Sequence, residues 1–275
     1  MAYVSTKLYI DQAAVAVRVE LFFPTDLPEI GTDIRGVITL LHGASNSNLE
    51  WVNLTSAYRY ASDKGYILVI PEAQNSFYHD MVYGAPFYTI LTRWLPEQLD
   101  RIFKIPSDPA LNYIAGLSMG GYGAMRIGLA NPQRYRAIGA FSAPLEAHAL
   151  AKDYPPETPL NYLTVPAFGT DRQVPPEADP LLLAEQVALL PAEQRPRLFT
   201  SCGLEDSEPY LILEQNRHFA EHLKQLPLDF RYLEWTGTHE WYFWDRSLAE
   251  FIGFIEDDDY ARLIQAHWDT PGRLH

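Results

Sequence analysis

The sequence predicts an α/β fold built on a mostly parallel, doubly wound sheet with an antiparallel strand at its N-terminal edge. Short apolar runs alternate along the chain with longer stretches that suit helices, which is typical of parallel strands covered by helices on both faces. Of the 275 residues, 47% are hydrophobic and 20% are charged, enough apolar material for one core of about 200 to 250 residues. We therefore expect a single domain over residues 1–275.

The first half of the chain supplies the edge strand and the first parallel strands. Apolar and polar residues alternate over 15–21, a period of two that indicates a strand with one buried face at an antiparallel edge. The runs 36–43 and 66–71 are almost entirely apolar and predict buried parallel strands, with a helix between them that ends near Gly65. The alternation continues with a helix within 86–103, a strand near 112–115, a helix over 120–131 and a strand at 137–141.

The second half of the chain interrupts this alternation once. After the strand that ends near Phe141, residues 144–196 are rich in proline and irregular, and their apolar content predicts a cap-like insertion packed over the sheet edge. Strands at 197–203 and 229–235 follow, and residues 257–275 are expected to form an appended helix or a loose tail. The predicted helices of this half lie within 210–225 and after Trp244.

The charge balance excludes several classes of partner. The net charge is −14, from 35 acidic and 21 basic residues, so nucleic acid and anionic membrane surfaces would be repelled. No run approaches the ~20 apolar residues of a membrane span, and the first residues lack a leader pattern, so we expect a cytoplasmic protein. The single cysteine, Cys202, rules out an intramolecular disulfide and a cysteine-rich zinc site. We expect no metal and no organic cofactor, and a homo-oligomer stays open because apolar insertions often take part in self-association.

A glycine-flanked serine is the strongest chemical signal in the chain. Gly116, Leu117, Ser118, Met119 and Gly120 fit the pattern Gly-x-Ser-x-Gly between an apolar strand and a helical run, which is the strand–turn–helix setting of a nucleophile elbow. A serine on so sharp a turn is strained, and side chains at the two glycines would collide with the neighbouring strand and helix. The alternative is that the glycines only permit a close strand–helix crossing.

A serine hydroxyl needs a histidine to take its proton and a carboxylate to orient that histidine. In this fold the acid and then the histidine follow the serine along the chain. His239 comes just after the strand at 229–235, and Asp206 comes just after the strand at 197–203, so both lie on loops at the carboxyl edge of the sheet. The less favoured acids are Glu205, Asp171 and Asp179, and the remaining later histidines are His148, His218, His222, His267 and His275.

The loops around this serine also suggest oxyanion donors and substrate contacts. The backbone N–H groups of Met119 and Ala44 can point toward a developing oxyanion, with His42 bracing the loop that carries Ala44. Aromatic residues crowd the same loops, and rim or core packing is the alternative role for each of them. The expected substrate contacts are Trp51, Tyr83 and Trp241, and Phe77, Tyr78 and Tyr242 share these loops.

Four segments, "LLHGASNSNLEW", "GLSMGGYGAMRIGL", "CGLEDS" and "GTHEWYFWDRSL", resemble the esterase D-like α/β-hydrolases, most closely their bacterial tributyrin-esterase branch. The resemblance covers about residues 3–256. It implies an α/β-hydrolase fold and a serine carboxylesterase that acts on small short-chain acyl esters, with Ser118 as nucleophile, His239 as base and Asp206 as orienting acid. An S-formylglutathione hydrolase or a carbohydrate or cinnamoyl ester esterase would use the same triad, and a non-catalytic binding protein on this fold is a further alternative.

Overall fold

The computed structural model describes residues 1–25, 34–146, 159–207 and 209–268. Its centre is an eight-stranded sheet in the order β1-β2-β4-β3-β5-β6-β7-β8. β1 and β2 pair antiparallel and β2 joins β4 antiparallel, whereas every pairing from β4 to β8 is parallel. The sheet therefore has the predicted antiparallel N-terminal edge, but its outermost strand is β1, and the strand expected at the edge over 15–21 is β2, which lies between β1 and β4. The strands are β1 (Ala2–Ile10), β2 (Val15–Phe23), β3 (Gly36–Leu41), β4 (Tyr66–Pro71), β5 (Asn112–Leu117), β6 (Ala137–Phe141), β7 (Arg197–Gly203) and β8 (Phe230–Trp235).

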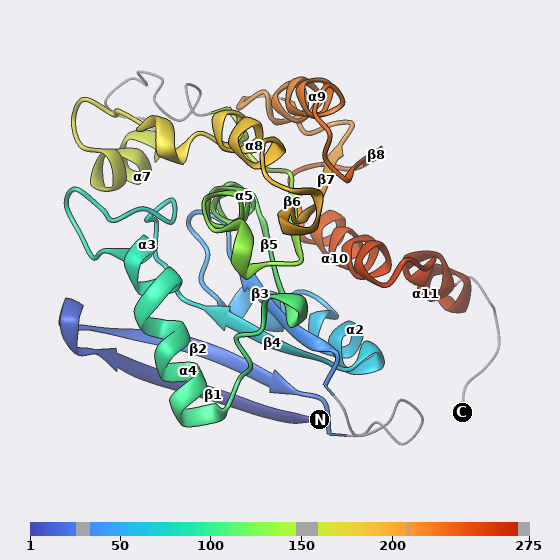
Figure 1. Cartoon of the computed structure of the whole chain (residues 1–275), viewed down its shortest axis with the longest axis horizontal. Coiled ribbons are helices and arrows are strands. Elements are labelled where there is room, and N and C mark those ends of the chain that lie inside the picture. Colours follow the sequence, from blue (N-terminus) through green and yellow to red (C-terminus); the bar gives the residue numbers. More distant parts are fainter. Residues whose placement is uncertain (26–33, 147–158, 208, 269–275) are drawn as a thin grey trace.

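Helices cover both faces of the sheet (Figure 1). They are α1 (Leu49–Asn53), α2 (Ala57–Lys64), α3 (Phe87–Thr89), α4 (Leu95–Phe103), α5 (Met119–Ala130), α7 (Pro159–Phe168), α8 (Pro180–Ala188), α9 (Ile212–Leu223), α10 (Trp241–Glu256) and α11 (Tyr260–Trp268). Helices α4, α5, α8 and α9 pack on one face, and α1, α2 and α10 pack on the other.

The continuous apolar runs of the sequence are explained by this two-sided cover. Successive side chains of a strand point to opposite faces of the sheet. Val37 and Val69 therefore join the core under α4 and α5, whereas their neighbours Ile38 and Leu68 join the core under α2 and α10. Because each of these strands buries both faces, neither shows the alternation seen in β2.

The helix expected within 86–103 is divided. Helix α3 runs into a π-helical turn at Ile90–Trp94 before α4 begins at Leu95. Pro96 has no N–H to donate to the carbonyl four residues earlier, and its ring crowds that carbonyl, so the regular helical ladder is interrupted here. α4 then presents Leu95 and Leu99 to the sheet.

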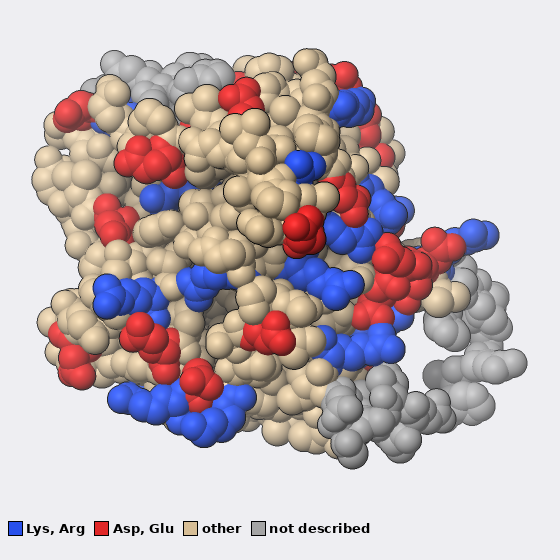
Figure 2. Space-filling view, in the orientation of Figure 1, with Lys and Arg blue, Asp and Glu red and all other residues tan. Residues whose placement is uncertain are grey.

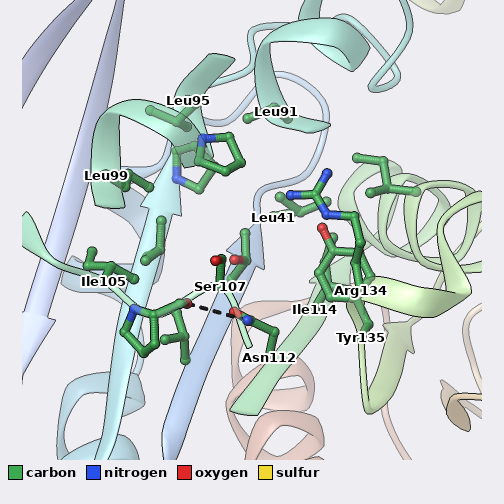
Figure 3. A pocket seen from close by; sticks show the side chains of 17 residues that line it. Leu41, Leu91, Leu95, Leu99, Ile105, Ser107, Asn112, Ile114, Arg134 and Tyr135 are labelled. Atoms are coloured by element: carbon green, nitrogen blue, oxygen red, sulfur yellow. Dashed lines mark hydrogen bonds between the residues drawn. The ribbon is translucent and has the colours of Figure 1, made fainter. Parts of the chain in front are cut away.

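A cavity of about 70 Å³ lies between α4 and the faces of β3, β4 and β5 (Figure 3). Leu95 and Leu99 line it from α4, Val69 lines it from the sheet, and Arg134 lies at its rim. None of the predicted catalytic residues Ser118, Asp206 and His239 lines it.

In the described part of the insertion, helix α8 packs against α5. A second attachment joins α7 to the loop after β4, where the N–H groups of Val82 and Tyr83 donate to the carbonyls of Ala167 and Pro166 at 3.2 and 3.0 Å. On the face drawn in Figure 2, acidic and basic side chains are interspersed, so no single-sign patch dominates it. Within the described ranges, no helix has the length and apolar character needed to cross a membrane.

Candidate active site

Ser118 occupies the sharp turn between β5 and α5. Its backbone has φ 51° and ψ −122°, a conformation that costs free energy for a residue with a side chain. The Ser118 N–H donates to the carbonyl of Phe141, at the end of neighbouring strand β6, over 2.8 Å. The turn therefore presents the serine hydroxyl at the carboxyl edge of the sheet in a fixed position.

The glycines on either side of the serine are required by close backbone contacts. A Cβ added to Gly116 would lie 2.3 Å from the carbonyl oxygen of Gly120. A Cβ added to Gly120 would lie 2.3 Å from the carbonyl oxygen of Leu41, at the end of β3. Such distances are far inside van der Waals contact, so the elbow can form only with glycine at both positions.

The structure brings the three predicted residues together. His239 Nε2 lies 3.0 Å from Ser118 Oγ, and His239 Nδ1 lies 2.9 and 3.1 Å from the two carboxylate oxygens of Asp206. The Asp206 side chain is 6% exposed and that of His239 is 33% exposed. The imidazole and the Trp244 ring are perpendicular, with their centroids 4.9 Å apart. Sequence reasoning missed Trp244, although its spacing of three residues from Trp241 on α10 places both on the same side of that helix.

The alternative acids have other partners. Glu205 accepts a hydrogen bond from the N–H of Gly237, which ties the loop after β7 to the loop after β8. Asp179 caps α8 by accepting from the N–H of Leu181 at 2.9 Å. Asp171 accepts from the hydroxyl of its neighbour Thr170 on the exposed surface. Each of these carboxylates therefore has a structural role away from His239.

The alternative histidines are also accounted for. His218 pairs with Glu146, and His222 Nε2 lies 3.1 Å from Glu185, so both α9 histidines face acids of the insertion. Within the described residues, no group of three or more His, Cys, Asp or Glu side chains could hold a metal ion. His267 falls in α11, and His148 and His275 lie outside the described residues.

The two residues predicted to donate to an oxyanion, Met119 and Ala44, lie at the start of α5 and on the loop after β3. Met119 opens α5, and the first N–H groups of a helix have no partner within it. Gly43 lies directly against the nucleophile, since a Cβ added there would be 3.5 Å from Ser118 Cβ. The next residue, Ala44, is half-buried, and no hydrogen bond within the described part of the chain occupies its N–H.

The three aromatic residues expected to contact substrate differ in exposure. Trp51 is completely buried, and its indole N–H donates to the carbonyl of Leu41 at 3.1 Å. This position corrects the expectation of a direct substrate contact, because Trp51 instead supports Trp241 through an edge-to-face contact of 5.7 Å. Trp241 is half-buried, and Tyr83 is 61% exposed on the loop that holds α7.

Buried polar residues lie beside the site, between the loop after β4 and the insertion. His79 Nε2 is 2.8 Å from the hydroxyl of Tyr122, and that hydroxyl donates to the carbonyl of Ala178 at 3.0 Å. The hydroxyl proton is thus used, so His79 must carry its own proton on Nε2. Burial, together with the positive charge of Arg126, lowers the pKa of His79 to about 2.

Comparison with known proteins identifies the family. The family model described as "Putative esterase" matches residues 18–255. The chain belongs to this esterase family. The esterase is 26% identical over 281 residues to an acetyl esterase of Caldicellulosiruptor saccharolyticus, an alignment that covers 94% of this chain and 100% of the relative.

Solved structures share the fold of this esterase. The serine hydrolase FphF of Staphylococcus aureus, described as fluorophosphonate-binding, superposes with a TM-score of 0.78 at 24% identity over 94% of this chain and 99% of its own. The S-formylglutathione hydrolase FrmB of the same organism gives a TM-score of 0.75 at 24% identity, covering 92% and 98%. The esterase thus has the α/β-hydrolase fold of these two proteins.

Proposed function

We propose that this esterase is a serine carboxylesterase that hydrolyses short-chain acyl esters through Ser118, His239 and Asp206. The observation that carries the proposal is the continuous chain of contacts from Ser118 Oγ through His239 to Asp206, at 3.0 and 2.9 Å. These distances are within hydrogen-bond reach of a general base and its orienting acid.

The first half of the reaction forms an acyl-enzyme. Ser118 Oγ attacks the carbonyl carbon of the ester while His239 Nε2 accepts the hydroxyl proton. The resulting tetrahedral oxyanion accepts hydrogen bonds from the N–H groups of Met119 and Ala44. The C–O bond to the alcohol then breaks, and His239 returns the proton to the departing oxygen.

The second half repeats this chemistry with water. His239 takes a proton from water, whose oxygen attacks the acyl carbon, and the collapse of the second oxyanion breaks the bond to Ser118 Oγ. The proton on His239 passes to the serine, which restores the starting enzyme and releases the carboxylic acid. Throughout, Asp206 keeps the Nδ1 proton in place and stabilises the imidazolium that forms.

A short acyl group is supported by the acetyl esterase relative, which aligns along its whole length. A thioester is the second candidate, because a structural neighbour with nearly full coverage is an S-formylglutathione hydrolase. Either substrate presents a carbonyl carbon to Ser118, and the leaving atom is oxygen in the ester and sulfur in the thioester.

The test compares hydrolysis of p-nitrophenyl acetate, butyrate and octanoate by the wild type and by Ser118→Ala. We expect the substitution to lower kcat by roughly 10⁵-fold. Ser142→Ala is a matched control: Ser142 also ends a buried strand, has φ 46°, and its buried hydroxyl has no hydrogen-bond partner within the described chain. Its kcat should stay close to that of the wild type.

Two results would contradict the proposal. Full activity in Ser118→Ala would show that Ser118 is not the nucleophile. Faster turnover of octanoate than of acetate would show that the enzyme does not prefer short acyl chains. Parallel assays with S-formylglutathione and with a sugar acetate then decide between ester and thioester substrates, since the favoured leaving group will show the higher kcat/KM.

A further inference from the structure

The peptide group that carries the Ala44 N–H is held by a buried histidine ring. His42 is completely buried, and its Nδ1 lies 2.8 Å from the carbonyl oxygen of Gly43. On the other side of the ring, the N–H of Ala73 donates to Nε2 at 3.0 Å. Glu72 Oε1 is 3.2 Å from the same Nε2. In either protonation state Nδ1 carries a proton and donates it to Gly43.

The preceding peptide group is held by a buried tyrosine. The Tyr78 hydroxyl donates to the carbonyl of His42 at 2.8 Å, and the side chain is completely buried. Its ring fills the space above Gly123 of α5, where an added Cβ would lie 2.2 Å from a ring carbon. The Arg126 guanidinium donates to the Tyr78 carbonyl. Tyr78 is therefore fixed at its ring, its hydroxyl and its backbone.

These contacts determine where the Ala44 N–H points. In a trans peptide the C=O and N–H point in opposite directions. With the Gly43 carbonyl directed to the His42 ring, the Ala44 N–H is directed away from it. Gly43 itself lies against Ser118, because a Cβ added to Gly43 would be 3.5 Å from the Ser118 Cβ.

We propose that His42 and Tyr78 are positioning residues, which fix two successive peptide groups so that the Ala44 N–H is aligned with the oxyanion at Ser118. This inference rests on the proposed function. Neither side chain touches the substrate, and each acts only through a backbone carbonyl. Their loss should weaken transition-state stabilisation more than substrate binding, because a misaligned donor affects the oxyanion and not the neutral ester.

The test uses Tyr78→Phe, which removes one hydroxyl and keeps the ring, with Tyr122→Phe as its matched control. Tyr122 is also completely buried and its hydroxyl is also hydrogen-bonded, but to His79 and Ala178 and not to the oxyanion loop. For Tyr78→Phe we expect kcat on p-nitrophenyl acetate to fall about 10- to 100-fold, less than the loss of a whole donor, with KM changed less than twofold. Tyr122→Phe should keep the kcat of the wild type.

A second readout separates positioning from stability. Phenylboronic acid forms a tetrahedral adduct with an active-site serine, so its inhibition constant should rise in Tyr78→Phe in proportion to the loss of kcat and remain unchanged in Tyr122→Phe. Rates are referred to the concentration of titrated active sites, so that a less stable variant is not scored as a slower one.

The outcomes distinguish this inference from the proposed function. Wild-type kcat in Tyr78→Phe, or equal losses in Tyr78→Phe and Tyr122→Phe, would overturn the positioning role while leaving Ser118 as nucleophile. A rise in KM with unchanged kcat would overturn it as well. An inactive wild type, or a fully active Ser118→Ala, would overturn the proposed function and this inference with it.

Discussion

His79 should make the folded protein sensitive to mild acid. In the folded state, burial and the charge of Arg126 lower its pKa to about 2, whereas the ordinary value is 6.5. The unfolded chain binds a proton below pH 6.5 that the folded chain does not, so stability is complete above pH 6.5 and is lost as the pH falls from 6.5 toward 2. At 1.36 kcal/mol for each pH unit, the loss at pH 5 is about 2 kcal/mol.

His79→Phe removes this titration and keeps a ring that can stack on Tyr122 and make the T-shaped contact with Phe168. At pH 7.5 the variant should be about 1 kcal/mol less stable than the wild type, because the hydrogen bond to the Tyr122 hydroxyl is lost. At pH 5 the order should reverse by about 1 kcal/mol, since the variant avoids the acid penalty of about 2 kcal/mol. Urea unfolding at both pH values measures the difference.

The control for this comparison is His218→Phe. His218 is exposed on α9 and pairs with Glu146, so its loss should give no gain in stability at pH 5. Parallel declines of the wild type and His79→Phe between pH 7.5 and 5 would refute the reasoning, because they would mean that His79 binds its proton equally well in the folded and unfolded chains.

Three further substitutions have defined outcomes. Asp206→Asn preserves shape but favours the wrong tautomer of His239, so kcat should fall by about 10⁴ while circular dichroism is unchanged; near-full activity would exclude Asp206 as the orienting acid. Gly123→Ala forces a Cβ to within 2.2 Å of the Tyr78 ring, so it should destabilise the fold by about 2 kcal/mol, and a raised Tm would contradict this packing. Val69→Ile adds one methylene to the cavity of about 70 Å³ and should add up to about 0.8 kcal/mol of stability; a lowered Tm would show that the cavity cannot accept it.

Much of the sheet could be predicted from local patterns. Most strands from β2 onward have either alternating apolar and polar residues, as at 15–21, or an apolar run bounded by turn residues, as at 66–71. Because the carboxyl ends of parallel strands share one edge, the chain order of Ser118, Asp206 and His239 was enough to predict that these side chains meet.

The elements that escaped prediction depend on tertiary contacts. β1 buries only Leu8 and Ile10, whereas Tyr3 and Tyr9 on its other face are exposed, so its apolar residues do not form a buried run. The strand is held by its pairing with β2. The burial of Trp51 could not be inferred because a loop position near Ser118 does not fix which way an indole points. The contact between Tyr78 and His42 joins residues 36 positions apart, and neither residue carries a local mark of the other.

The two partners of the nucleophile come from the loops after the last two strands of the sheet, with His239 placed 121 residues beyond Ser118. Under the proposed mechanism, a growing polypeptide contains its reactive serine long before the base that activates it has been synthesised. Translation that stops after α5 and before His239 yields a product with the serine elbow and without its base. The time at which ribosome-bound chains begin to hydrolyse ester would therefore report when β8 joins the edge of the sheet next to β7.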